Sequence, residues 1–111
     1  PTPGYSTSGL STLVNNSIPA TYRLYQNYPN PFNPLTTLRY DLPEDAIINI
    51  IIYDIMGRVV RTLVNNQQNA GFKSIQWNAT NNQGMSVSSG VYLYKIQAGN
   101  FTQTKKLILL K

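Results

Sequence analysis

Apolar and polar residues alternate along most of the chain from residue 22 onward. Alternation places successive side chains on opposite faces of an extended chain, so it predicts strands. The predicted strands cover residues 22–26, 36–42, 47–55, 59–64, 72–77, 91–98 and 101–110. Turn residues separate them, including a polar stretch at 65–71 and the pair Gly99-Asn100, which suits a two-residue hairpin loop.

No segment sustains the 3.6-residue spacing of an amphipathic helix. Short strands at regular spacing, separated by Gly, Asn and Pro, are typical of a β-sandwich. An OB-type barrel is the alternative, and it is less favoured because that fold usually includes a helix. The sequence therefore predicts an all-β antiparallel sandwich of about seven strands.

Residues 1–21 differ in composition from the rest of the chain. They are rich in Pro, Ser, Thr, Gly and Asn and contain no charged residue. This predicts an extended arm or linker at residues 1–21, followed by one domain at residues 22–111. Residues 27–34 (NYPNPFNP) predict a rigid irregular segment, because its three prolines lack backbone donors. We expect Tyr28 and Phe32 to pin this segment to the domain.

Composition excludes several classes of function. The net charge is +5, but the nine Lys and Arg residues are spread along the chain rather than clustered, which argues against a nucleic-acid interface. The absence of His and Cys removes imidazole bases, thiol nucleophiles and disulfides, so we expect no enzymatic activity and no cofactor. No apolar run approaches the ~20 residues of a membrane-spanning helix.

The four carboxylates allow few kinds of site. Asp41, Glu44 and Asp45 could offer oxygen ligands to calcium, although their spacing matches no calcium-binding loop. Asp41 and Asp54 end predicted strands, where we expect them to accept hydrogen bonds from local backbone amides. They are not a recognisable catalytic pair, because nothing in the sequence places two of them across a cleft.

The aromatic residues allow a second kind of site. Tyr92 and Tyr94 lie on one face of a predicted strand and could form a sugar-binding platform. Aromatic residues in a central strand are more often part of the core, which we expect for both tyrosines and for Trp77.

Several linked blocks of sequence resemble the type A C-terminal sorting domain of the type IX secretion system. The blocks are NYPNPFNP (27–34), TTLRYDLP (36–43), IYD (52–54), GR (57–58), TLV (62–64), AG (70–71), WN (77–78), Gly84, SGVYLY (89–94) and the Lys-rich end (105–111). Their order and spacing cover residues 22–111. The same pattern is similar to the immunoglobulin-like domain of flagellar hook-capping proteins, so the resemblance implies an immunoglobulin-like sandwich.

The resemblance also implies a function. It implies a non-catalytic C-terminal sorting and anchoring module of an exported bacterial surface protein. The outer-membrane secretion translocon would recognise it, and a sortase-like peptidase would often remove it at the cell surface. In that family recognition concentrates on the final strands, which implies sorting-signal roles for Gly90, Tyr92, Lys105, Lys106 and Lys111.

The strand at residues 47–55 departs from the family pattern. Ile48, Ile50 and Ile52 occupy inward positions, so Ile47 and Ile51 should lie on the outer face, beside Tyr53. Either the strand is simply very apolar, or the arm or another subunit covers its outer face.

A covered outer face would suit a different function. The chain would be a subunit of an extracellular filament or sheath, in which the arm adds as a strand to a neighbouring sheet edge. Interface candidates are Leu10, Leu13, Val14 and Ile18 in the arm, and Ile47 and Ile51 in the strand. A carbohydrate-binding module is the third hypothesis.

Overall fold

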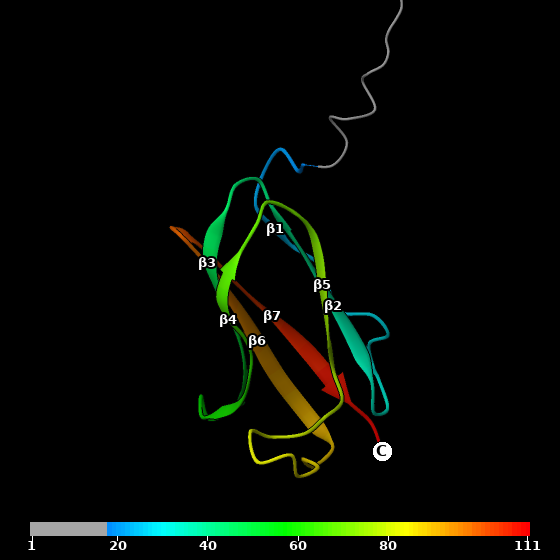
Figure 1. Cartoon of the computed structure of the whole chain (residues 1–111). Helices are drawn as coiled ribbons and strands as arrows, with labels where there is room; N and C mark the ends of the chain where they lie inside the picture. Colours follow the sequence, from blue (N-terminus) through cyan, green and yellow to red (C-terminus); the bar gives the residue numbers. More distant parts are fainter. Residues whose placement is uncertain (1–17) are drawn as a thin grey trace, which may run out of the picture.

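The computed structural model describes residues 18–111, and it contains strands and no helix in that range. The strands are β1 (Arg23–Leu24), β2 (Thr36–Leu42), β3 (Ala46–Asp54), β4 (Val59–Gln68), β5 (Gly71–Trp77), β6 (Gly90–Ala98) and β7 (Phe101–Leu109). They form two antiparallel sheets, β1-β2-β5 and β4-β3-β6-β7, packed face to face (Figure 1). The predicted immunoglobulin-like β-sandwich is confirmed. The division into an arm at 1–21 and a domain at 22–111 stays a prediction.

The core fills the space between the two sheets. Ile48, Ile50 and Ile52 of β3 are fully buried, as their alternation predicts. Across the sandwich, Leu38 and Leu42 of β2 are buried equally well. Each such side chain contributes about 1.5–3 kcal/mol relative to an exposed position, so the inward face of these two strands supplies much of the stability of the domain.

Two strands differ from their predictions by more than one residue in length. Strand β4 continues to Gln68, so the predicted turn at residues 65–71 is wrong over most of its length. Its polar end pairs with the start of β3, where Ile48 lies opposite Asn66. Since β4 is the last strand of its sheet, these polar side chains face solvent. The sequence of residues 65–68 therefore looks like that of a turn. Strand β1 is shorter than predicted, at two residues.

The proline-rich segment closes one side of the sandwich. The Phe32 amide donates to the Ile108 carbonyl (3.0 Å), and the Leu110 amide donates to the Phe32 carbonyl (2.9 Å). The Phe32 side chain is buried in the core. The three X–Pro bonds of the segment are cis. By occupying the edge of β7, the segment removes unpaired backbone groups that could otherwise recruit another strand.

Tyr28 does not anchor this segment through its side chain, contrary to the prediction. The ring is exposed, and only the Tyr28 backbone is held, by two hydrogen bonds with Thr37 (2.9 and 3.0 Å). Asn27 takes the anchoring role instead. Its buried amide donates to the Tyr94 hydroxyl (2.8 Å), and its side chain donates to Thr36 Oγ1 (3.0 Å). A buried polar network therefore fixes the segment to the core.

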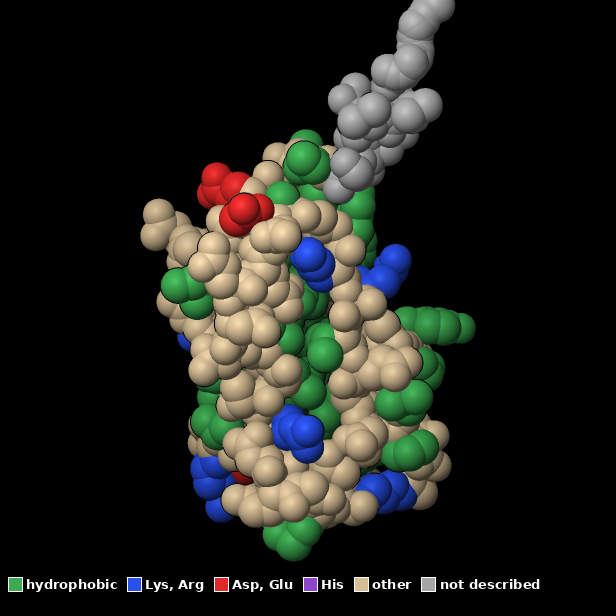
Figure 2. All heavy atoms as spheres, in the orientation of Figure 1, with side chains coloured by type: hydrophobic (Ala, Val, Ile, Leu, Met, Phe, Trp, Pro, Cys, Tyr) green, Lys and Arg blue, Asp and Glu red, His purple; other side chains and the backbone are tan. Residues whose placement is uncertain are grey.

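The opposite side of the sandwich is more open. Strands β4 and β5 are each the last strand of a sheet, and they are consecutive in the chain. Val60 and Leu63 of β4 and Ile75 of β5 pack against the core but stay partly exposed. In Figure 2, apolar side chains are visible along the furrow between the two strands.

Candidate functional site

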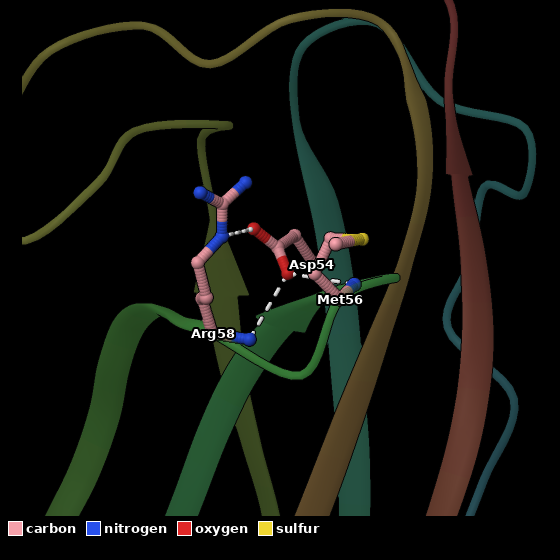
Figure 3. Close-up of polar contacts among 3 residues, drawn as sticks. All are labelled: Asp54, Met56 and Arg58. Carbon is pink, nitrogen blue, oxygen red and sulfur yellow. Dashed lines mark hydrogen bonds and ion pairs between the residues drawn. The ribbon is translucent and has the colours of Figure 1, made fainter.

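Two turns at one end of the sandwich share a single hydrogen-bond pattern, and we call residues 54–58 and 81–85 the twin turns. In each turn, Oδ1 of the first residue accepts hydrogen bonds from the amides of the third and fifth residues. Asp54 Oδ1 accepts from Met56 (2.9 Å) and Arg58 (3.0 Å), as Figure 3 shows. Asn81 Oδ1 accepts from Gln83 and Met85 (both 3.0 Å).

The backbone bonds of the twin turns match as well. The amide of the glycine at the fourth position donates to the carbonyl of the first residue, at 3.0 Å from Gly57 to Asp54 and at 2.9 Å from Gly84 to Asn81. In both turns the amide of the first residue donates to the carbonyl of the fifth, at 3.0 Å from Asp54 to Arg58 and at 2.8 Å from Asn81 to Met85. Both glycines have a positive φ, +84° and +82°, a region that Gly enters without steric cost. The sequence Asx-x-x-Gly thus specifies both turns.

The Asp54 carboxylate is committed to its own turn. Its second oxygen, Oδ2, accepts a hydrogen bond from Arg58 Nε at 2.8 Å (Figure 3). The Arg58 backbone amide, its side chain and the Met56 amide together hold the pKa of Asp54 below its usual value, against the opposing effect of burial. The Arg58 side chain is largely exposed, so the ion pair itself contributes little to stability. The expectation that Asp54 accepts local backbone amides is confirmed.

An open cleft of about 350 Å³ lies between the twin turns. It is lined by Asp54, Arg58, Val59, Val60, Asn81, Asn82, Gln83 and Val87. Asn82 joins the two sides of this region, since its amide donates to the Val60 carbonyl (3.1 Å) and its Oδ1 accepts from the Thr62 amide (2.9 Å). Arg61 Nη1 donates to the Asn81 carbonyl (2.8 Å). The cleft offers amide and guanidinium donors to a ligand, and its one carboxylate is already engaged.

The other acidic residues do not form a common site. Asp41 Oδ2 accepts a hydrogen bond from the Tyr25 hydroxyl (2.6 Å) rather than from a local amide, contrary to the prediction. Asp45 Oδ1 accepts from the Ala70 amide (2.8 Å), and Glu44 accepts from the Tyr22 hydroxyl (3.0 Å). Within residues 18–111, no three acidic side chains come close enough together to hold a metal ion, so the structure does not bring Asp41, Glu44 and Asp45 into one cluster.

The sorting-signal candidates lie between the middle of the β6–β7 ladder and the end where β6 begins. Gly90 pairs with Leu109, Tyr92 with Leu107, Leu93 with Lys106 and Tyr94 with Lys105. The Lys111 ammonium donates to the Val87 carbonyl, close to Gly90 in sequence. Lys106 and Lys111 are exposed and Lys105 is half-buried. The structure thus brings together residues that are about fifteen positions apart in sequence, and their proposed roles stay predictions.

Tyr92 and Tyr94 belong to the core, as expected. Tyr92 is buried, contacts Trp77 edge-to-face at a centroid distance of 5.6 Å, and donates to the Ser88 carbonyl (2.6 Å). Tyr94 and Trp77 are buried too. None of the three rings is available to stack on a sugar, so the aromatic platform of the carbohydrate hypothesis is wrong.

The interface candidates are dispersed. Leu10, Leu13 and Val14 lie outside the described residues. Ile18 and Ile47 are exposed, and Ile51 is half-buried on the outer face of β3, which confirms the predicted orientation of the two β3 residues. Ile51 lies between Thr62 and Lys95 on the neighbouring strands, and Asn49 separates it from Ile47. The two isoleucines therefore do not form a continuous patch with each other.

Comparisons with known proteins agree with this architecture. A family model described as the FlgD Ig-like domain matches residues 34–101. No curated protein sequence matches the chain. Among solved structures, FlgD from P. aeruginosa is 25% identical with a TM-score of 0.53, and the match covers 67% of this chain and 58% of FlgD.

Two solved structures from Porphyromonas gingivalis share the fold over nearly all of the chain. Dimeric latent PorU has a TM-score of 0.65 at 21% identity, and PorZ, a component of the type-IX secretion system, has a TM-score of 0.54 at 21% identity. The matches cover 96% and 94% of this chain but only 10% and 13% of those proteins. At this identity they show the fold alone. The family model spans more than half of the chain, and the protein therefore belongs to the FlgD Ig-like domain family.

Proposed function

We propose that the domain is a non-catalytic C-terminal sorting module of an exported bacterial surface protein, recognised by the type IX secretion machinery. The observation that carries this proposal is the pairing of the last two strands, which places Lys105 and Lys106 near the middle of the β6–β7 ladder and Gly90 and Lys111 at the end where β6 begins. Lys105 lies on the inner face of β7, whereas Lys106 lies on its outer face and Lys111 follows the strand, so the ammonium groups of Lys106 and Lys111 are accessible to a translocon. The type IX role of PorZ, which shares the fold, supports the proposal.

The lysines supply the recognition chemistry. Lys106 and Lys111 are exposed, so their ammonium groups can steer the domain toward an acidic surface on a partner. Tyr92 acts differently, because its buried ring can support the shape of the end but cannot contact a partner directly. The partners are the outer-membrane translocon and then a sortase-like peptidase, and the site of action is the bacterial cell surface.

The test is export of a reporter fused in front of the chain, in a bacterium that has this secretion system. Deleting residues 105–111 also removes the buried Leu107 and Leu109 and would unfold the domain, so charge variants give the sharper result. We expect the triple variant Lys105→Gln/Lys106→Gln/Lys111→Gln to leave the reporter in the periplasm.

The matched control changes charge elsewhere, with Lys73→Gln/Lys95→Gln in strands β5 and β6. This variant should reach the surface at the wild-type level. Normal surface display of a folded triple variant would refute recognition through these lysines.

A second candidate function is a structural subunit assembled by strand addition. The observation that favours it is the difference between the two sides of the sandwich. The proline-rich segment covers the edge of β7, while β4 and β5 end their sheets beside partly exposed Val60, Leu63 and Ile75. An added strand could pair with such an edge and cover these side chains.

Negative-stain microscopy of the full chain, beside a version lacking residues 1–20, tests this candidate. Filaments from the full chain alone would support strand addition by the N-terminal segment. Monomers in both samples would contradict the candidate and leave the sorting module as the proposed function.

A further inference from the structure

Exposed apolar side chains gather at the end of the sandwich formed by the twin turns. Six of the eleven large apolar side chains that are most exposed within residues 18–111 lie there, namely Ile55, Met56, Val59, Met85, Val91 and Leu110. Ile55, Met56 and Met85 are 71%, 75% and 59% exposed, and all three belong to the twin turns. We call this set of six, with the turns that carry it, the twin-turn end. In Figure 1 the β3–β4 turn, the β5–β6 loop and the C-terminus all lie at this end.

Hydrogen bonds hold these segments together. The 81–85 turn is held against β4 by the hydrogen bond from the Asn82 amide to Val60. The C-terminal segment reaches the same loop through the bond from Lys111 to Val87. The exposed apolar groups therefore come from three parts of the sequence that the fold holds together.

The charges at the two ends of the sandwich differ. Three basic residues lie near the twin-turn end, since Lys106 pairs with Leu93 opposite Tyr53, Lys111 bonds Val87, and Arg58 belongs to a twin turn. The one carboxylate there, Asp54, is paired with Arg58, so Lys106 and Lys111 give the end a net positive charge. Glu44 and Asp45 lie in the turn before β3, whereas Asp54 is the last residue of β3. Because β3 has nine residues, the two ends are about 26–30 Å apart. The twin-turn end is therefore basic and apolar, whereas the other end carries Glu44 and Asp45, and acidic groups are visible at the top of Figure 2.

The twin turns satisfy their own backbone donors. Amides of the third, fourth and fifth residues of both turns donate to the first residue, through its Oδ1 or its carbonyl. Moving an unpaired backbone amide from water into a poorly hydrated environment costs several kcal/mol of free energy. These six amides avoid that cost because each is already hydrogen-bonded within its turn. The turns can therefore place Ile55, Met56 and Met85 against an apolar surface without exposing unpaired amides at those positions to it.

We propose that the twin-turn end docks on an anionic lipid surface. Ile55, Met56 and Met85 enter the boundary between headgroups and acyl chains, while Arg58, Lys106 and Lys111 lie among anionic headgroups. A lipid surface fits better than a protein pocket because the apolar groups lie on two separate turns, and a fluid bilayer adapts to both. Tyr22, which bonds Glu44, lies at the opposite end of the sandwich. This inference does not depend on the sorting function.

Co-sedimentation of the full chain with vesicles tests the proposal. We expect binding to vesicles of phosphatidylcholine with about 30% phosphatidylglycerol, weak binding to phosphatidylcholine alone, and weaker binding as the salt rises from about 0.1 M to about 0.5 M. Ile55→Glu/Met56→Glu should weaken binding at least about tenfold. Because both side chains are exposed, the variant should fold. The matched control is Ile47→Glu, since Ile47 is 65% exposed at the opposite end, and it should bind like the wild type.

A site-specific probe adds a direct readout of insertion. The chain has no cysteine, so Met56→Cys and Ile47→Cys can each carry a single environment-sensitive fluorophore. Its emission should shift to the blue on anionic vesicles only at position 56. Absence of vesicle binding, equal shifts at both positions, or equal weakening by Ile47→Glu would each overturn the proposal. If Ile55→Glu/Met56→Glu abolished export but bound vesicles normally, the end would recognise a protein and not lipid.

Discussion

The buried hydroxyl of Tyr94 connects the proline-rich segment to the core. It accepts a hydrogen bond from the Asn27 amide and donates one to the Tyr25 carbonyl, both at 2.8 Å. The Tyr94 side chain and Asn27 are both buried, so water cannot replace these contacts without a rearrangement. Tyr94→Phe removes the hydroxyl and preserves the ring, which makes it a sensitive test of how the segment is held.

The expected loss of stability follows from the groups left without a partner. A buried donor or acceptor without a hydrogen bond costs about 1–3 kcal/mol, and Tyr94→Phe leaves one of each. We expect the free energy of unfolding to fall by about 2–4 kcal/mol, since Tyr25 is only half-buried and its carbonyl can regain some hydration. This is a large fraction of the ~5–15 kcal/mol that is typical of a domain.

Urea denaturation of the purified domain measures this loss directly. Tyr28→Phe is the control, because Tyr28 lies in the same segment with its ring 78% exposed, and it should change stability by less than about 0.5 kcal/mol. Amide exchange adds a local readout, since the Asn27 amide should exchange faster in Tyr94→Phe than in the wild type. If Tyr94→Phe were as stable as Tyr28→Phe, the hydroxyl would not hold the segment and the reasoning would be wrong.

Three further predictions concern pH and the twin turns. Burial raises the pKa of Tyr94 to about 12 from 10.0. The contribution of Tyr94 to stability is therefore present below about pH 10, and about 2–3 kcal/mol of it is lost as the pH rises toward 12. Urea midpoints measured over a pH series should vary less in Tyr94→Phe than in the wild type. Gly57→Ala and Gly84→Ala should each cost about 1–2 kcal/mol, because both positions have positive φ but open space, and thermal unfolding should show equal losses if the turns are equivalent. The pKa of Asp54 is lowered in the folded domain, so the contribution of its carboxylate to stability is present above the unfolded pKa and is lost as the pH falls below about 4. When stability is followed as the pH is lowered, Asp54→Asn should not show this loss of stability.

The strands were predictable because alternation is a local signal. Residues 36–42 match β2 at both ends, and the β6–β7 hairpin lies where Gly99-Asn100 predicts a turn. The end of β4 was missed for a tertiary reason. An edge strand that faces solvent can be polar on both faces, and only its pairing with β3 distinguishes residues 65–68 from a turn.

The candidate site was predictable only in part. The role of Asp54 follows from its place at the end of a strand, and its carboxylate does cap the following turn. The relation of this turn to Asn81 was missed, although both sequences read Asx-x-x-Gly. The signal was therefore present, but 27 positions separate the two turns and only the fold makes them neighbours across a cleft. The exposure of Met56 and Met85 follows from the same geometry and could not be deduced from composition.

The proposed functions use surfaces that overlap at two residues. Lys106 and Lys111 belong both to the sorting surface and to the basic border of the twin-turn end, so charge variants alone cannot separate recognition by a translocon from attraction to lipid. Ile55 and Met56 belong only to the twin-turn end, and strand addition would use the side of β4 and β5. Combining Ile55→Glu/Met56→Glu with the lysine variants in one export and vesicle series therefore assigns each activity to its own residues. If one domain carries both a sorting signal and a lipid-docking end, we expect only the lysine variants to lose export. We then expect both the lysine variants and Ile55→Glu/Met56→Glu to lose vesicle binding.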